Sequence, residues 1–209
     1  MLISILFESP QMFLIVVMAL VYALTIHEFS HAAAATYLGD NTAKNNGRLN
    51  LNPMSHLDVF GTIMLLFAGF GWGKPVPVNI HNLRFRRWGD AIVSLAGPIS
   101  NFISGIVFIL IYNALAGVLP WDNLVFTFLF YLVFINFILG IFNLIPIPPL
   151  DGSHVLFAVL PDKYADFKRK LSINGPWILL VLIVLDRFAG INIFSRIFGF
   201  FIDAILKFL

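Results

Sequence analysis

Long apolar runs separated by short polar loops make up most of the chain. A helix needs about 20 apolar residues to cross the hydrocarbon core of a bilayer. Three runs reach that length, 11–38, 91–120 and 124–145, while a shorter fourth run, 176–185, needs its flanks to complete a crossing. The tail 191–209 is apolar but carries three charged residues, and we expect it to lie along the interface or to insert obliquely. The pattern predicts an all-α polytopic membrane protein, a bundle of about 4 to 6 transmembrane helices.

The segment 59–80 does not fit a plain spanning helix. Residues 59–73 are apolar but short, and four glycines interrupt them. The residues that follow, 74–79, read KPVPVN and are typical of an extended strand. We therefore expect a short re-entrant or β-hairpin segment near 59–80, with a full crossing as the alternative.

Loop charges bear on this choice. Lysine and arginine gather in three loops, 44–48, 84–87 and 163–170, whereas the loop 117–123 carries none. Membrane proteins carry an excess of Lys and Arg in their short cytoplasmic loops. If 59–79 enters the membrane and returns, all three basic loops share the cytoplasmic side and the N-terminus lies outside. A crossing would instead place 44–48 opposite 84–87.

Composition supports a membrane protein and excludes other classes. Of 209 residues, 59% are hydrophobic and only 11% are charged, whereas soluble domains carry roughly a quarter charged residues. The formal net charge of +2 comes from short Lys/Arg clusters, which suit loops facing anionic lipid and not the basic stripe of a nucleic-acid-binding protein. The chain has no cysteine, so any metal must be held by His, Asp or Glu. We expect one membrane domain over 1–209, with its apolar start in the mature protein.

The sequence His27-Glu28-Phe29-Ser30-His31 lies near the end of the first apolar run. A spacing of four puts both imidazoles on one helix face, where they can bind one zinc ion. Glu28 stands beside the first ligand, as this motif requires, to take a proton from the attacking water and deliver it to the leaving amine. Each ionisable group inside an apolar span costs roughly a few kcal/mol without a partner or task. We therefore interpret the motif as a metal site and not as a chance match.

A catalytic zinc normally has three protein ligands and one open position, so a third ligand must come from elsewhere. Asp151 is the first candidate, because it follows the stretch NLIPIPPL (143–150), whose three prolines predict a broken helix near 143–152. Irregular backbone at membrane depth lines a site or a cavity. Asp151 could also cap the helix that starts at Ser153, and one carboxylate can do both. The other candidates are His154, which ranks second, and His56, His81, Asp58 and Asp186.

Several further polar residues are candidates for supporting roles. Asn143 could donate an amide hydrogen bond to the oxyanion of peptide hydrolysis, or could bond the broken helix backbone instead. For Asn101 and Asn136 we favour buried amides that serve helix packing. His56 could orient a ligand or contact substrate, or lie at the surface, and His154 is a candidate for the same two roles if it is not a ligand.

Together these stretches resemble the site-2 protease family, specifically its compact bacterial and archaeal members without an appended PDZ or CBS domain. The matching stretches are HEFSHAAAATYLGD from His27, GRLNLNPMSHLDVFGT from Gly47, GWGKPVPVN from Gly71, AGPISN from Ala96 and NLIPIPPLDGSHVL from Asn143. They follow one another in order over most of the chain up to residue 160. The departures are Val59 and Ile80, which stand where relatives often have proline.

The resemblance implies a zinc cofactor held by His27, His31 and Asp151, with Glu28 as catalytic acid and base. It implies Asn143 as an active-site amide. It also implies that the segment 71–79, which ends at Asn79, borders the cleft and pairs with an unwound substrate by β-addition. Asn79 is therefore a candidate substrate contact.

The expected function is zinc-dependent hydrolysis of peptide bonds within or beside the transmembrane segment of a single-span membrane protein or membrane peptide. The resemblance places the enzyme in a prokaryotic cell membrane with its site nearer the cytoplasm. A zinc transporter or metal-sensing membrane protein is the alternative, but the spans 91–119 and 124–145 lack the second set of acids or histidines that a transport path requires. A catalytically inactive relative is disfavoured by the intact Glu28. Cobalt or iron could occupy the same ligands, and zinc is the default for a hydrolytic site of this kind.

Overall fold

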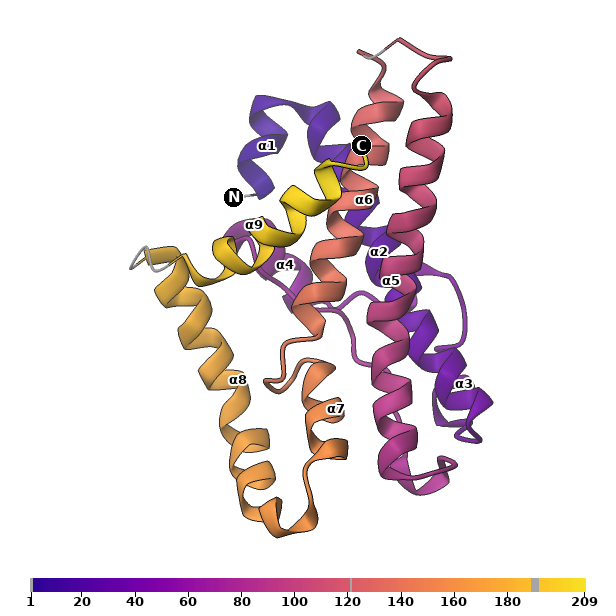
Figure 1. The fold of residues 1–209 in the computed structure, drawn as a ribbon, viewed down its shortest axis with the longest axis vertical. Coiled ribbons are helices and arrows are strands. Elements are labelled where there is room, and N and C mark those ends of the chain that lie inside the picture. The colour runs from indigo at the N-terminus through magenta and orange to yellow at the C-terminus, as the bar shows by residue number, and fades with distance from the viewer. Residues whose placement is uncertain (1, 121, 189–191) are drawn as a thin grey trace.

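Helices account for nearly all regular structure in the computed structural model, which describes residues 2–120, 122–188 and 192–209. Three are long and apolar enough to cross a membrane: α2 (Pro10–Tyr37), α5 (Arg87–Leu115) and α6 (Leu124–Asn143). They pack side by side at the centre of the molecule (Figure 1). The predicted all-helical membrane protein is confirmed. Its three candidate spans among the described residues are fewer than the expected bundle of about 4 to 6 helices.

Local sequence signals set the ends of the first span. A short helix, α1 (Leu2–Glu8), precedes it, and Ser9 begins α2 by accepting a hydrogen bond from the Met12 amide at 3.4 Å, with Pro10 in the first turn. A serine cap followed by proline favours a helix start, because the serine hydroxyl accepts a bond from one free N–H group and proline lacks an N–H group altogether. Gly39, two residues after the end of α2, has φ 105°, which stops the helix. The helix α3 (Thr42–Asn45) follows.

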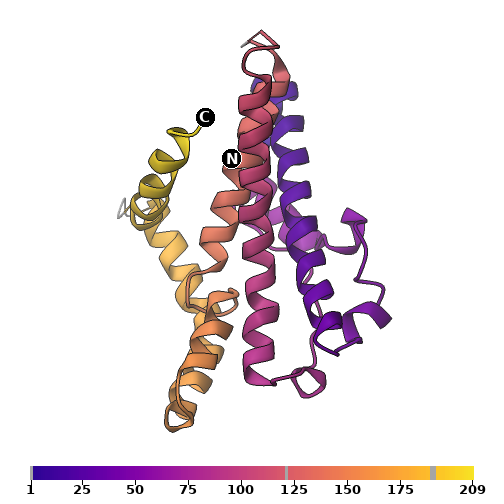
Figure 2. The ribbon, with the colours of Figure 1, turned by 45° about the vertical axis from the view of Figure 1, so that its right-hand side comes forward.

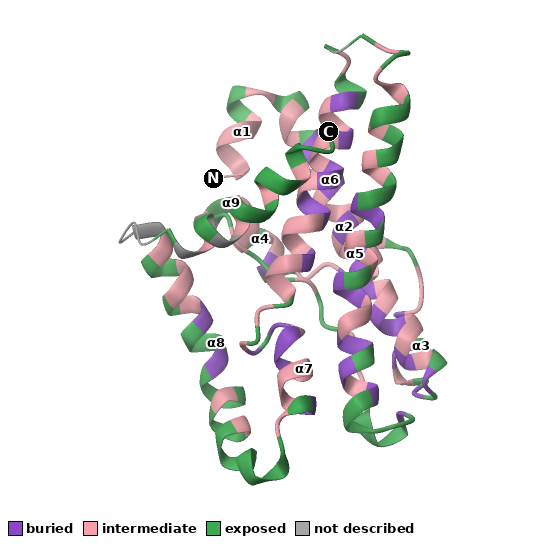
Figure 3. Cartoon of the chain, viewed as in Figure 1, coloured by how far each residue is buried: buried purple, intermediate pink, exposed green. Residues whose placement is uncertain are grey.

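Small residues let the spans approach one another, while large apolar residues face outward. Ala19 and Ala23 of α2 are fully buried in a cluster with Leu132 of α6. On the outer face of α5, Leu110 is 65% exposed, which suits contact with lipid tails and not with water. Buried residues accordingly concentrate where α2, α5 and α6 meet (Figure 3).

The segment 59–80 forms a short helix followed by irregular chain, so the β-hairpin expectation is wrong. Its apolar part is α4 (Val59–Ala68), which Asp58 caps at the start and Gly69, with φ 80°, ends. Ten residues make about 15 Å of helix, half of the hydrocarbon thickness. No strand is assigned in the described residues of this segment, where the isolated antiparallel bridge Leu57–Gly73 is the nearest feature. The prolines of 74–79 remove the N–H groups that a ladder needs.

The predicted break near 143–152 is present. After α6 ends at Asn143, irregular chain leads to α7 (Gly152–Val159), which returns beside α5. The start of α7 packs closely against the end of α6, because a Cβ atom on Gly152 would overlap the Leu144 carbonyl. A turn containing η3 (Asp162–Tyr164) then leads to α8 (Ala165–Phe188). α8 stands apart from the three-helix centre (Figures 1 and 2) and approaches the proline loop at Gly175, whose Cβ position lies 2.7 Å from the Pro148 carbonyl oxygen.

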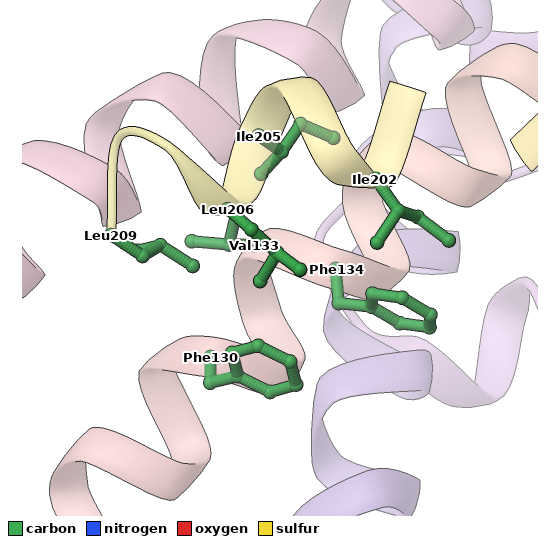
Figure 4. A pocket seen from close by; sticks show the side chains of 7 residues that line it. All are labelled: Phe130, Val133, Phe134, Ile202, Ile205, Leu206 and Leu209. Carbon is green, nitrogen blue, oxygen red and sulfur yellow. The ribbon is translucent and has the colours of Figure 1, made fainter. Parts of the chain in front are cut away.

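The C-terminal helix α9 (Ile193–Leu206) crosses α6. Between them lies a small pocket whose lining is wholly apolar (Figure 4): Phe130, Val133, Phe134, Ile202, Ile205, Leu206 and Leu209. With no polar group in its wall, this pocket is a packing gap and not a site for chemistry. The helix α9 therefore covers part of α6. Residue 191, where the predicted tail segment begins, and residues 189 and 190 lie outside the described part of the chain.

The three basic loops lie at one end of the molecule, as the re-entrant reading requires. The Arg84 amide donates to the Leu38 carbonyl at 2.8 Å, which joins the second basic loop to the end of α2. Arg87 pairs with Asp162 at 3.2 Å, which joins the second loop to the third. The loop between α5 and α6 is at the opposite end (Figure 1).

Candidate metal centre

Three side chains from two distant parts of the chain converge at one point. His27 and His31 lie one turn apart on α2, with their Nε2 atoms 3.0 Å apart. Asp151, at the end of the proline loop, places Oδ2 at 3.1 Å from the His27 Nε2 and 3.3 Å from the His31 Nε2. These ligand atoms all lie within 4.8 Å of one another. The group has the composition of a hydrolytic zinc site, two imidazoles and one carboxylate.

Hydrogen bonds across the bundle fix the orientation of His27. Asn136 donates from Nδ2 to the Leu132 carbonyl at 2.7 Å, so its Oδ1 accepts from the Asn101 Nδ2 at 2.9 Å. Asn101 also donates to the Ala23 carbonyl at 3.0 Å, which leaves its Oδ1 as an acceptor 2.7 Å from the His27 Nδ1. His27 must therefore donate from Nδ1 and present the lone pair of Nε2 to the site.

His31 is held in the same way by the backbone of α5. Its Nδ1 lies 2.8 Å from the Val93 carbonyl oxygen, which can only accept. As a neutral imidazole, His31 therefore also presents its Nε2 lone pair to the site. With both imidazoles neutral, two nitrogen lone pairs and one carboxylate oxygen face the same point.

The Asp151 oxygen at this point is the observation that tests for a metal. Oδ2 is buried and has no hydrogen-bond partner among the described residues. When both imidazoles are neutral, this buried carboxylate oxygen faces two nitrogen lone pairs, and a cation between them offsets the repulsion and the loss of solvation. The residues present therefore fit a divalent metal ion, and His27, His31 and Asp151 would hold it.

A cavity of about 500 Å³ opens beside these three groups. Glu28 lies on its wall and is 9% exposed. The wall combines the metal-binding group with the irregular chain after α4 and the start of α7. It includes Trp72, Pro75, Val76, Val78, Asp90, Asn143 and His154. The cavity thus places the Glu28 carboxylate, the candidate metal-binding group and the chain after α4 around one space.

Comparison with known proteins assigns the family. The sequence profile of Peptidase family M50 matches residues 119–183, which include the proline loop and Asp151. YwhC of Bacillus subtilis, a zinc metalloprotease by its name, is 38% identical over 173 residues, covering 80% of this chain and 79% of its own. The chain belongs to peptidase family M50. This is the site-2 protease family that the sequence motifs indicated.

Other M50 relatives extend this assignment. Rip2 of Mycolicibacterium smegmatis, also named for zinc metalloprotease activity, is 30% identical over 90% of this chain and 73% of its own. Protease RseP of Photorhabdus luminescens is 38% identical over 52% of this chain and 44% of its own. No solved structure gives a significant match. The chain is thus a site-2 protease-like zinc metalloprotease and a multi-pass membrane protein with bacterial relatives.

The other residues predicted for the M50 site fall in different places. Asn143 lines the cavity, but its Nδ2 donates to the Leu139 carbonyl at 3.0 Å, within its own helix. His56 is fully buried outside the cavity wall, with Nε2 at 2.8 Å from the Asn50 carbonyl oxygen. Asn79 is exposed and caps the 3₁₀ turn η2 (Ile80–Asn82) with its side chain. None of these three belongs to the group formed by His27, His31 and Asp151.

His154, the rival third ligand, faces the cavity from α7 without joining the metal-binding group. Its Nδ1 lies 2.7 Å from the Asp90 Oδ2, and this hydrogen bond raises the pKa of the imidazole above its ordinary value. Asp90 was not predicted from the sequence, since its partner is 64 positions away. The sequence feature that could have indicated Asp90 is its position, a carboxylate directly before an apolar span.

Asn101 and Asn136 were assigned to helix packing, and the structure gives Asn101 a further task. If Asn101 orients His27, Asn101→Ala lowers zinc affinity by about 10- to 100-fold, as loss of a partner behind a metal ligand does. Competition with a chromophoric chelator measures this. Asn113→Ala is the matched control, because Asn113 lies on the same helix and bonds the Phe208 carbonyl. Equal zinc affinity in the two variants would remove Asn101 from the site.

Proposed function

We propose that the chain is a zinc-dependent endopeptidase that hydrolyses peptide bonds within or beside the transmembrane segments of membrane proteins. One observation carries this proposal. A two-histidine, one-carboxylate group lies on an apolar spanning helix and opens, next to Glu28, into a cavity bordered by extended backbone. A hydrolytic metal and a docking edge for peptide are the two parts that such an enzyme needs.

Each polar residue of the site has a distinct role in this proposal. His27, His31 and Asp151 hold zinc, which when bound polarises the scissile carbonyl and lowers the pKa of the attacking water. Glu28 takes a proton from that water and passes it to the leaving amine. The low exposure of Glu28 keeps the carboxylate out of bulk water, where competing proton exchange would be fast.

Asn143 and His154 are the proposed contacts to substrate. Asn143 reaches the cavity wall and can stabilise the oxyanion once its amide turns away from the Leu139 carbonyl. In His154, Asp90 accepts from Nδ1, so Nε2 is the nitrogen that remains for substrate. The side chain of His154 is 43% exposed, which leaves it accessible from the cavity.

The substrate in this proposal is a locally unwound single-span segment. A helix hides its carbonyl groups in internal hydrogen bonds, so it must open before one of them reaches the metal. The extended chain 74–79 offers backbone groups with which an opened segment can pair. Helix-breaking residues near the cleavage site are therefore expected in good substrates.

The proposed orientation places the site nearer the cytoplasmic face. The three basic loops share one end of the molecule, and an excess of Lys and Arg marks the cytoplasmic side. Under this orientation α4 dips into the membrane and returns, since it is too short to cross. α8 and α9 then complete the protein at or within the bilayer.

Removal of the metal tests the function. Purified protein in liposomes is incubated with a panel of single-span membrane substrates, before and after treatment with a chelator. We expect cleavage to disappear with chelator and to return on addition of one equivalent of zinc, since the three ligands suit a single ion. Absence of cleavage across the panel, together with zinc flux into the liposomes, would favour a transporter instead.

A further inference from the structure

Asp40 ties the end of the zinc-binding helix to the extended segment 74–79. It lies three residues beyond α2 and is 0% exposed. Its Oδ2 accepts from the Asn79 backbone N–H at 2.7 Å, while Oδ1 accepts from the Thr42 amide and from the Asn82 side chain at 3.1 Å each. One buried carboxylate thus holds both the turn after α2 and the C-terminal end of the segment.

Arg48 holds the other end of the same segment. Its guanidinium donates to the Lys74 carbonyl at 2.6 Å and to the Pro75 carbonyl at 2.9 Å, and only 5% of the residue is exposed. The buried His56 lies 3.5 Å from the same group, and its own carbonyl accepts from the Lys74 amide at 2.8 Å. A planar, rigid donor fork suits two successive carbonyl groups better than a lysine does.

The chain between these two anchors keeps its backbone free. Val76 and Val78 line the cavity beside the metal-binding group. Within the described part of the protein, the N–H groups of these two valines make no hydrogen bond. Pro75 and Pro77 contribute no N–H groups, so the valine amides are the donors that this stretch can offer to another chain.

We propose that Asp40 and Arg48 are positioning residues that clamp 74–79 at both ends, so that its register relative to the zinc-binding helix decides which peptide bond is cut. The inference rests on the proposed function. A buried charged group is costly without a partner, and here each of the two bonds the backbone at one end of the segment: Asp40 the Asn79 N–H, and Arg48 the Lys74 and Pro75 carbonyls. Because Asp40 follows His31 by nine residues on one continuous element and its turn, the metal and the docking segment form a single unit.

Asp40→Asn opens one end of the clamp with almost no change in shape. The amide keeps one oxygen for Thr42 but turns an NH₂ group toward the Asn79 N–H, where two donors oppose each other. Arg48→Lys opens the other end, since an ammonium group lacks the two-pronged geometry. Asp58→Asn is the matched control, because an asparagine also caps a helix and α4 keeps its start.

Mobility of the segment is measured first and needs no substrate. The chain contains no cysteine, so Val76→Cys carries a single nitroxide spin label. We expect restricted label motion in the otherwise unchanged protein and in Asp58→Asn, and an added mobile component in Asp40→Asn and in Arg48→Lys. Unchanged spectra in both clamp variants would overturn the inference.

Cleavage by unlabelled protein then tests the register. With a single-span substrate that the wild type cuts, we expect both clamp variants to raise KM about tenfold, the loss of one charge-assisted hydrogen bond. Mass spectrometry should show new cleavage sites one or two residues from the original. Zinc content and kcat should stay near wild type. A single unchanged cleavage site together with the wild-type KM in both clamp variants would overturn the inference. If the wild type cuts no substrate, the proposed function is rejected, and the spin-label spectra alone then show whether Asp40 and Arg48 hold the segment.

Discussion

Replacing Glu28 with glutamine is expected to abolish proteolysis while zinc stays bound. The change keeps the size of the side chain but removes the group that accepts a proton from water, and general acid–base catalysis contributes on the order of 10²- to 10⁴-fold. Glu28 does not belong to the metal-binding group, so its loss leaves His27, His31 and Asp151 in place. Turnover of a single-span substrate and zinc content, measured on the same sample, test both halves of the expectation.

Glu8→Gln is the control for this change. The chain contains two glutamates, and Glu8 is exposed at the end of the short helix α1. The control removes the same charge without touching the cavity and should keep wild-type turnover. Wild-type turnover in Glu28→Gln would instead move the proton transfer to another group, for which the Asp90–His154 pair on the cavity wall would be the next to replace.

The candidate metal-binding group was predictable because local sequence signals place its members. A separation of four residues on a helix fixes the relation of His27 to His31 before any tertiary contact is known. Asp151 was predicted because three prolines force irregular backbone at membrane depth, where it must line a site. In both cases the signal lies within about ten residues of sequence, which is the range over which backbone geometry is determined locally.

The support of the ligands was not predictable in the same way. Asn101 meets His27 across 74 positions of sequence, and that contact depends on how far α5 is rotated and shifted against α2. An amide in an apolar run indicates a hydrogen bond but not its partner. The same limit explains Asp40 and Arg48, which lie in ordinary polar loops and acquire partners 39 and 26 positions away.

The error at 59–80 has a local cause. Alternation in KPVPVN predicts a strand, but a strand in a hairpin needs a ladder of N–H donors, and Pro75 and Pro77 lack them. In the structure two charged side chains hold the ends of this stretch in place of a ladder. No strand is assigned in the described residues 74–79, so the strand predicted there was wrong.

The Gly97→Ala variant is expected to lose its zinc although Gly97 is not a ligand. A Cβ atom at this position of α5 would lie 2.5 Å from the His31 Nε2 and 2.6 Å from the His27 Cε1. Neither ring can swing aside freely, because each Nδ1 is held by a buried acceptor, the Asn101 side chain or the Val93 carbonyl. The added methyl group therefore displaces a metal ligand or breaks the hydrogen bond that orients it.

Gly105→Ala separates this effect from general crowding of the bundle. Gly105 lies on the same helix, and its Cβ would come equally close, 2.5 Å, to the Phe137 ring, which does not line the cavity beside the metal-binding group. Both variants should be destabilised by overpacking, about 1–3 kcal/mol. Only Gly97→Ala should fall to less than about a tenth of the wild-type zinc content, consistent with the effect of misplacing a ligand. Full zinc occupancy in a folded Gly97→Ala protein would show that the two imidazoles do not bind the metal beside Gly97 of α5. His27 and His31 would then have to be replaced as the proposed ligands.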